Sequence, residues 1–197
     1  MTSSTPRAPS THYRAPARVL HWLMAAMVLA MLFIGVGLVA SVSARHPWLL
    51  ALHEPLGALV LVLALVRLGY RLRHPPPALP PTVAPLERFA VKSTNALFYA
   101  LLIAQPLVGL ALVLAAGGPL VLGPIRPPAW LAPNATLFAL LREAHSLLAF
   151  GLFALVLAHL GAVLFHALVH RDGILSSMAF GEGTRERPPA SSPSNPP

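Results

Sequence analysis

Five histidines fall within long apolar stretches of this 197-residue chain. An ionisable side chain is costly to bury in a membrane and usually has a functional reason to be there. A neutral imidazole binds metals through either of its ring nitrogens. The sequence has no cysteine, which excludes thiolate ligands and covalent attachment of a c-type haem. Any metal chemistry would therefore depend on these residues, which are His21, His53, His145, His159 and His166.

The apolar stretches that carry these histidines predict four transmembrane helices. The chain is 56% hydrophobic and 10% charged, and its mean hydropathy is +0.69, which is too apolar for a soluble domain. Each stretch has the ~20 residues that a helix needs to cross a hydrocarbon core of ~30 Å. The predicted fold class is an all-α membrane protein with a four-transmembrane-helix bundle. The spans run roughly over 19–41, 49–70, 93–116 and 140–169.

Both ends of the chain are rich in Ser, Thr, Pro and Arg, and this composition predicts disordered tails. The domain prediction is an N-terminal tail at 1–16, one transmembrane domain at 17–180 and a C-terminal tail at 181–197. No cleavable signal is expected, because the first apolar stretch is too long for one. A Pro-rich polar connection is predicted over 71–92, and an apolar loop on the membrane interface over 117–139.

The basic residues predict which side of the membrane each connection faces. The net charge of +8 fits this topology better than nucleic-acid binding, because the basic residues lie between the apolar spans. Four crossings place both termini on one side. Eleven of the 14 Lys and Arg residues fall on that side, so both termini are predicted to be cytoplasmic. The three on the other side are Arg45, Arg126 and Arg142.

Four of the histidines are predicted to pair at two depths. His21 opens the first helix near the cytoplasm, whereas His53 and His145 open the second and fourth helices near the outer face. His159 follows His145 by 14 residues. Fourteen residues rise ~21 Å and make almost four turns, so both side chains project from nearly the same side of the helix. His53 therefore shares the outer level with His145, and the other two share the inner level.

Two facing imidazoles can ligate one haem iron from both sides. The pattern thus predicts two bis-histidine b-type haems about 20 Å apart, close enough for transmembrane electron transfer. A zinc or di-iron site would need its ligands clustered at one level with carboxylates nearby. Histidines that hydrogen-bond between helices without a metal are the simpler alternative, and pairing by both depth and face argues against it. His166 stays open as an alternative to His159 as the inner ligand.

Other residues share the predicted faces. Arg67 lies 14 residues after His53, at the inner depth. Haem propionates would supply the anion that a buried arginine needs, although a snorkelling arginine that sets the topology would fit equally well. Gly35 occupies the outer depth on the first helix, where a missing side chain would let a porphyrin approach. Gly57 and Gly151 would relieve crowding in the same way, or they are ordinary helix-packing glycines.

From about residue 17 to 180 the sequence resembles the bacterial cytochrome b561 family, within a superfamily that includes Ni-hydrogenase cytochrome b subunits. Four motifs carry the resemblance, and their order and spacing together are specific. They are RVLHWLMA, LHEPLGALVLVLALVRLGYRLRHPPPALP, YALLIAQPLVGL and AHSLLAFGLFALVLAHLGAVLFHALVHRDGILSSM. Lys92 and Asn95 stand where many members have histidines, and Ala167 stands where many have a second histidine after the position of His166.

The resemblance implies particular residues for the cofactor site. The iron ligands implied for the two haems are His21, His53, His145 and His159, and Arg67 is implied to lie in the cofactor site. It also implies a multi-pass protein of the bacterial inner membrane, active in respiratory electron transport.

The resemblance implies a diheme cytochrome that transfers electrons between a periplasmic-side donor and a ubiquinone-type membrane quinone. Superoxide is one donor suggested by family members that resemble a superoxide oxidase, and the three outer arginines would attract such an anion. Whether the chain is itself an enzyme, a superoxide:quinone oxidoreductase, is left open. The alternative is a haem-b subunit that anchors a separate dehydrogenase or hydrogenase, docked through 117–139. A third hypothesis is a haem-free membrane scaffold or transporter.

Overall fold

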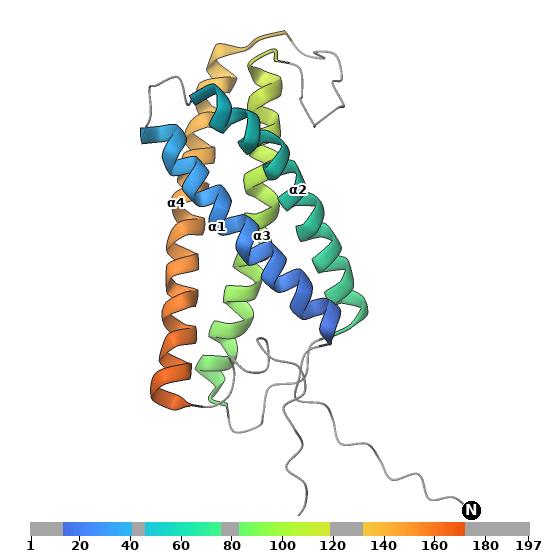
Figure 1. Cartoon of the computed structure of the whole chain (residues 1–197), viewed down its shortest axis with the longest axis vertical. Helices are drawn as coiled ribbons and strands as arrows, with labels where there is room; N and C mark the ends of the chain where they lie inside the picture. The colour runs from blue at the N-terminus through green and yellow to red at the C-terminus, as the bar shows by residue number, and fades with distance from the viewer. Residues whose placement is uncertain (1–13, 41–45, 76–82, 119–131, 172–197) are drawn as a thin grey trace, which may run out of the picture.

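The chain folds into four long helices. The computed structural model describes residues 14–40, 46–75, 83–118 and 132–171. Within these ranges there is no β-strand, and the predicted all-α four-helix fold is confirmed. The helices are α1 Ala15–Ala40, α2 His46–Arg73, α3 Pro85–Ala115 and α4 Ala135–Phe165, and α4 continues into a short π-helix, η1 His166–His170 (Figure 1).

All four helices are long and apolar enough to cross a membrane. They contain 26, 28, 31 and, with η1 included, 36 residues, which exceeds the ~20 residues that a crossing needs. Large apolar side chains cover their outer surfaces, as Phe33 with 76% and Phe150 with 72% of the side chain exposed illustrate. Such a surface is stable in lipid and unstable in water. The chain is therefore a multi-pass membrane protein.

The helices run alternately up and down, and α1 and α2 incline across the more upright α3 and α4 (Figure 1). The closest packing joins helices that are consecutive in the sequence, α1 with α2, α2 with α3 and α3 with α4. By contrast, α4 makes few contacts with α1 or with α2. The helix pairs that were predicted to share histidine levels are thus not the pairs that pack most tightly.

The buried core forms a layer at mid-height in the bundle. Val28, Val60 and Leu152 are buried, and each follows the first membrane histidine of its helix by seven residues. Seven residues rise about 10 Å, half the interval between the two predicted histidine levels. The residues that we call the central apolar layer are Met24, Val28, Val60, Ala64, Leu102 and Leu152. This layer separates the two histidine levels.

All four helices begin before their predicted spans, and the early starts of α3 and α4 correct the boundaries of the connections that precede them. Residues 85–92 belong to α3 and residues 135–139 belong to α4. Apolar content marks where a helix enters lipid, whereas capping decides where the helix begins. Pro85 occupies the first turn of α3, where its missing N–H has no cost. The side chain of Asn134 caps α4 by accepting a hydrogen bond from the backbone N–H of Leu137 at 2.9 Å.

Several predictions fall outside the described residues. The C-terminal tail and most of the N-terminal tail lie there, and so does residue range 119–131 of the interfacial loop. Of the three outer arginines, Arg142 is described, and it is exposed near the start of α4. Pro106 lies inside α3 and is buried there, and the helix continues through it. Membrane helices tolerate such a proline because neighbouring groups satisfy the freed carbonyl.

Candidate functional site

The outer level brings together two histidines from different helices. His53 of α2 and His145 of α4 have ring centroids 6.1 Å apart, with ring planes at 72°. Each ring is half-buried. The Nδ1 atom of each is fully buried and has no hydrogen-bond partner among the described residues. Buried ring nitrogens without partners are uncommon in folded proteins, so this couple calls for an explanation beyond packing.

The inner level brings together His21 of α1 and His159 of α4. Their ring centroids are 6.5 Å apart and the planes meet at 77°. Phe98 of α3 packs edge-on against His159 with centroids 5.3 Å apart. The structure thus places side by side the same residues that the depth argument paired. Their role as iron ligands stays a prediction.

The separation within each couple can be compared with two kinds of bonding. An imidazole nitrogen lies roughly 1.1 Å from the ring centre and about 2 Å from a bound metal, so two rings on one metal have centroids about 6.2 Å apart. A direct hydrogen bond of about 2.9 Å between the rings would bring the centroids to about 5.1 Å. At 6.1 and 6.5 Å, both couples have the spacing that admits an iron atom between the rings. The donor set therefore fits haem.

Arg67 reaches from α2 to the inner couple. Its Nη1 lies 3.0 Å from Nδ1 of His21. A guanidinium group only donates hydrogen bonds, so Nδ1 is the acceptor in this arrangement. No carboxylate among the described residues pairs with Arg67. Its side chain therefore points toward the inner histidines, at the depth that the sequence predicted.

The three glycines that the sequence singled out differ in their surroundings. A Cβ atom on Gly35 would meet nothing within 4 Å, although the residue is half-buried. A Cβ on Gly57 would approach the terminal methyl of Met31 at 3.5 Å, an ordinary contact. Gly151 is exposed and gives room to no described neighbour. Of these three glycines, Gly35 alone combines partial burial with open space that would suit a porphyrin edge.

Sequence reasoning assigned no residue of α3 to the site, and three of them contact histidines in the structure. Besides Phe98, Gln105 donates a hydrogen bond from Nε2 to the backbone carbonyl of His145 at 3.1 Å. One turn later, Gly109 lies against the ring of His145, because a Cβ there would be 3.1 Å from its Cε1 atom. The sequence signal for Gln105 was an amide deep within an apolar span, followed four residues later by a glycine.

His166 lies apart from the inner couple. Its ring stacks on that of His170 with centroids 5.2 Å apart and planes at 29°, and both belong to η1. The residue that faces His21 is His159. The geometry therefore favours His159 over His166 for the inner level.

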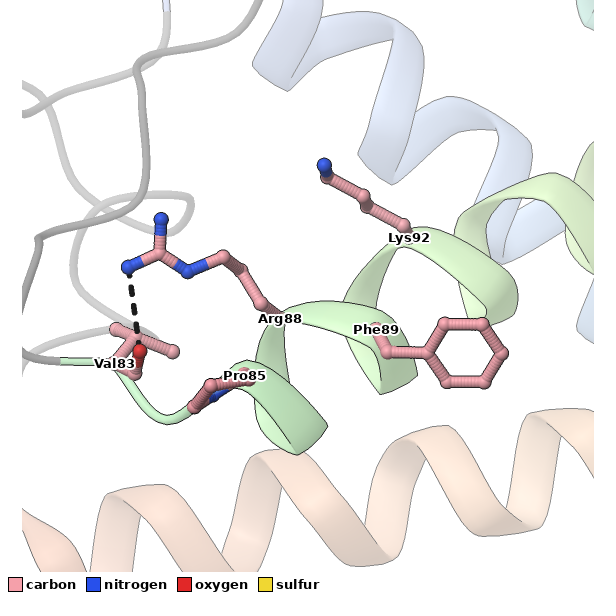
Figure 2. A pocket seen from close by; sticks show the side chains of 5 residues that line it. All are labelled: Val83, Pro85, Arg88, Phe89 and Lys92. Carbon is pink, nitrogen blue, oxygen red and sulfur yellow. Dashed lines mark hydrogen bonds between the residues drawn. The ribbon is translucent and has the colours of Figure 1, made fainter.

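An open hollow lies at the N-terminal end of α3, and none of the paired histidines lines it (Figure 2). Its volume is about 470 Å³. Arg88 turns back to donate a hydrogen bond to the carbonyl of Val83 at 3.2 Å, and the side chain of Phe89 extends in the direction opposite to that of Arg88. Lys92 also lines the hollow, at a position where the sequence departs from the resemblance pattern. The remaining lining residue is Pro85.

Four membrane helices with facing imidazoles at two heights define the class of helical membrane cytochromes. The family model for prokaryotic cytochrome b561 matches residues 12–181. The chain belongs to this family, as its motifs predicted. It is accordingly a protein of membrane electron transport from a family that binds b-type haem.

Curated relatives of this chain carry related names. Cytochrome b561 homolog 2 of Escherichia coli (strain K12) is 28% identical over 170 residues, covering 84% of this chain and 90% of that protein. The probable superoxide oxidase CybB of Yersinia pestis is 31% identical over 134 residues, covering 68% of this chain and 76% of that protein. Cytochrome b561 homolog 1 of E. coli (strain K12) is 29% identical over 126 residues, covering 64% and 72% respectively.

Proposed function

We propose that this protein is a diheme b-type cytochrome that carries electrons across the bacterial inner membrane between an outer-side donor and a membrane quinone. The observation that carries the proposal is the pair of histidine couples, with ring centroids 6.1 and 6.5 Å apart at two levels of the bundle. Residues 17–180 act as a single domain for this purpose. Haem supplies a one-electron carrier at each level.

The histidines hold the two irons in this proposal, His53 with His145 at the outer level and His21 with His159 at the inner level. Support comes from the few contacts that α4 makes with α1 or α2, although α4 shares both couples with them. Helices that meet through ligand side chains rather than through close packing leave room for a flat group between them.

Arg67 has a part in the inner site. If Nε2 of His21 held the iron, the proton of the neutral ring would sit on Nδ1, which would donate a hydrogen bond and no longer accept one. The guanidinium group of Arg67, which lies 3.0 Å from Nδ1, would then need another acceptor. A haem propionate is an acceptor of suitable charge, and arginine binds carboxylates through two parallel hydrogen bonds.

Superoxide is the proposed donor. The relative from Y. pestis is named as a probable superoxide oxidase. In this chain, Arg142 is exposed on α4 three residues before His145, so it places a positive charge near the outer couple. A positive charge at the entrance raises the encounter rate of an anion. Two superoxide ions each lose one electron and leave as dioxygen, and the two electrons with two protons convert one ubiquinone-type quinone to quinol.

The cofactor content tests the first half of the proposal. Protein purified in detergent should contain two haems per chain by the pyridine haemochrome method. The absorption spectrum of the untreated protein should show that both haems are low-spin and six-coordinate. A ratio of one or zero in fully loaded protein would contradict it.

Superoxide tests the second half separately. Superoxide generated beside the oxidised protein should reduce both haems and, with quinone added, yield quinol in a one-to-two ratio to superoxide consumed. If the haems stay oxidised, the donor is wrong and the diheme assignment stands.

A further inference from the structure

Gln105 lies at the contact between α3 and α4, next to the outer histidine couple. Its Nε2 donates to the backbone carbonyl of His145 at 3.1 Å. Its Oε1 is buried and accepts no hydrogen bond from a described residue. Nδ1 of His145 is buried without a partner as well. An unused acceptor and an unused ring nitrogen therefore occur on two residues that already touch.

The orientation of the His145 ring brings its Nδ1 to the α3 side. A Cβ on Gly109 would lie 3.1 Å from Cε1 and 3.5 Å from Nδ1 of this ring. The ring edge that carries Nδ1 thus faces α3, whereas Nε2 does not lie within 4 Å of that Cβ. Gly109 follows Gln105 by four residues, so both lie on the same face of α3.

We propose that Gln105 is a positioning residue for the outer haem: its side-chain oxygen accepts a hydrogen bond from Nδ1–H of His145 when Nε2 of that ring binds iron. This inference rests on the proposed haem ligation. Iron on Nε2 leaves the ring proton on Nδ1, and a metal-bound histidine almost always donates this second N–H to a nearby acceptor. Among the described residues, Oε1 of Gln105 is the one buried side-chain oxygen without a hydrogen bond.

One amide would then hold α4 at two points. Its nitrogen would still donate a hydrogen bond to the backbone carbonyl of His145, and its oxygen would accept one from the ring N–H of the same residue. The second bond fixes the ring orientation and makes the imidazole a stronger electron donor to iron. A stronger donor favours the oxidised iron. The hydrogen bond from His145 to Gln105 therefore lowers the midpoint potential of the outer haem and leaves that of the inner haem unchanged.

Redox titration of the full-length holoprotein tests this role with Gln105→Leu, which keeps the side-chain volume and removes the acceptor. Asn95→Leu is the matched control, because Asn95 is also an amide of α3 but bonds to its own helix at Val91. We expect Gln105→Leu to raise the ratio of reduced to oxidised outer haem about tenfold at a fixed ambient potential, which is about 59 mV for one electron. The inner haem and the control should not change.

Gln105→Glu separates positioning from simple helix packing, because the carboxylate keeps an acceptor and loses the donor. The inference predicts that Gln105→Glu holds the outer potential at or below that of the wild type. Equal potentials in Gln105→Leu, Asn95→Leu and the wild type overturn the inference, as does loss of the outer haem from both Gln105 variants alike. If the wild type itself lacks two haems, it is the proposed function that fails.

Discussion

At the scale of single residues, a membrane histidine becomes informative when a second histidine stands opposite it at the same depth. The interval of 14 residues between His145 and His159 was enough to predict two levels from the sequence. The structure adds the lateral pairing, with centroids 6.1 Å apart at the outer level and 6.5 Å apart at the inner level. The ring separation is a stricter criterion for a metal-binding couple than shared depth, because two rings joined by a direct hydrogen bond would have closer centroids.

Substitution of one ligand should remove one haem. His145→Ala should lower the haem-to-protein ratio from two to one and abolish the outer redox wave, and His159→Ala should do the same for the inner wave, because a single imidazole holds iron weakly. The pyridine haemochrome ratio and a redox titration measure this. His166→Ala is the control and should keep both haems. Loss of the inner haem from His166→Ala, with retention in His159→Ala, would reassign the inner ligand.

Gly35 offers a test of where the porphyrin lies. Gly35→Leu should leave the helical bundle intact, because a side chain there meets no protein atom within 4 Å of its Cβ. It should nevertheless lower the occupancy of the outer haem severalfold if the porphyrin fills that space. The Soret absorbance per chain, with helicity by circular dichroism, measures both effects. Gly161→Leu is the matched control, since Gly161 also has open space but is exposed on α4. Equal haem content in the two variants would place the porphyrin elsewhere.

At the scale of the helices, α4 is the element that organises the site. It carries a histidine of each couple, yet it packs closely only against α3. The interval between its histidines could be read from the sequence. The contacts of Phe98, Gln105 and Gly109 could not, because α3 has no histidine to reveal which way it is rotated. Residues on a helix that carries no ligand can be assigned to a site only when the packing of that helix is known.

The cap of α4 should matter for the stability of the outer level. Asn134→Ala removes the hydrogen bond to the backbone N–H of Leu137, and the loss of an N-cap destabilises a helix by about 1 kcal/mol. We expect faster loss of the outer haem on heating, followed by the Soret band at fixed temperature. Asn95→Ala, in which an exposed side chain is changed, should stay within about 0.5 kcal/mol of the wild type. An unchanged rate in Asn134→Ala would show that this end of α4 does not limit haem retention.

At the scale of the whole molecule, the four-helix membrane fold followed from composition and from the length of the apolar spans. The helix ends did not. The first turns of α3, from Pro85, carry charged residues and were assigned to the polar connection, whereas those of α4, from Ala135, are apolar and were assigned to the interfacial loop. The side of the membrane on which the termini lie stays a prediction from eleven basic residues against three. The bundle as a whole consists of closely packed consecutive helices, and α4 makes few contacts with α1 or α2 although it shares both histidine couples with them.

Haem should therefore stabilise the bundle itself. A ligand that binds only the folded state adds about 2.7 kcal/mol when present at a hundredfold excess over its dissociation constant. Protein made under haem limitation should be cut faster by protease and should melt at a lower temperature than loaded protein. Reconstitution with haem should restore both values in the wild type, whereas a variant with all four paired histidines changed should not respond. Equal protease resistance with and without haem would mean that the helices hold together by packing alone.

The central apolar layer has a consequence for energy conversion. Its six side chains, Met24, Val28, Val60, Ala64, Leu102 and Leu152, carry no group that takes up or releases a proton. Under the proposed function, an electron passes this layer without a compensating ion, so its inward movement displaces net charge toward the negative side of an energised membrane. The field opposes a full crossing by about 2.3 kcal/mol per 100 mV. The membrane potential that respiration builds would then slow electron transfer through the protein, and a fall in that potential would let the transfer speed up.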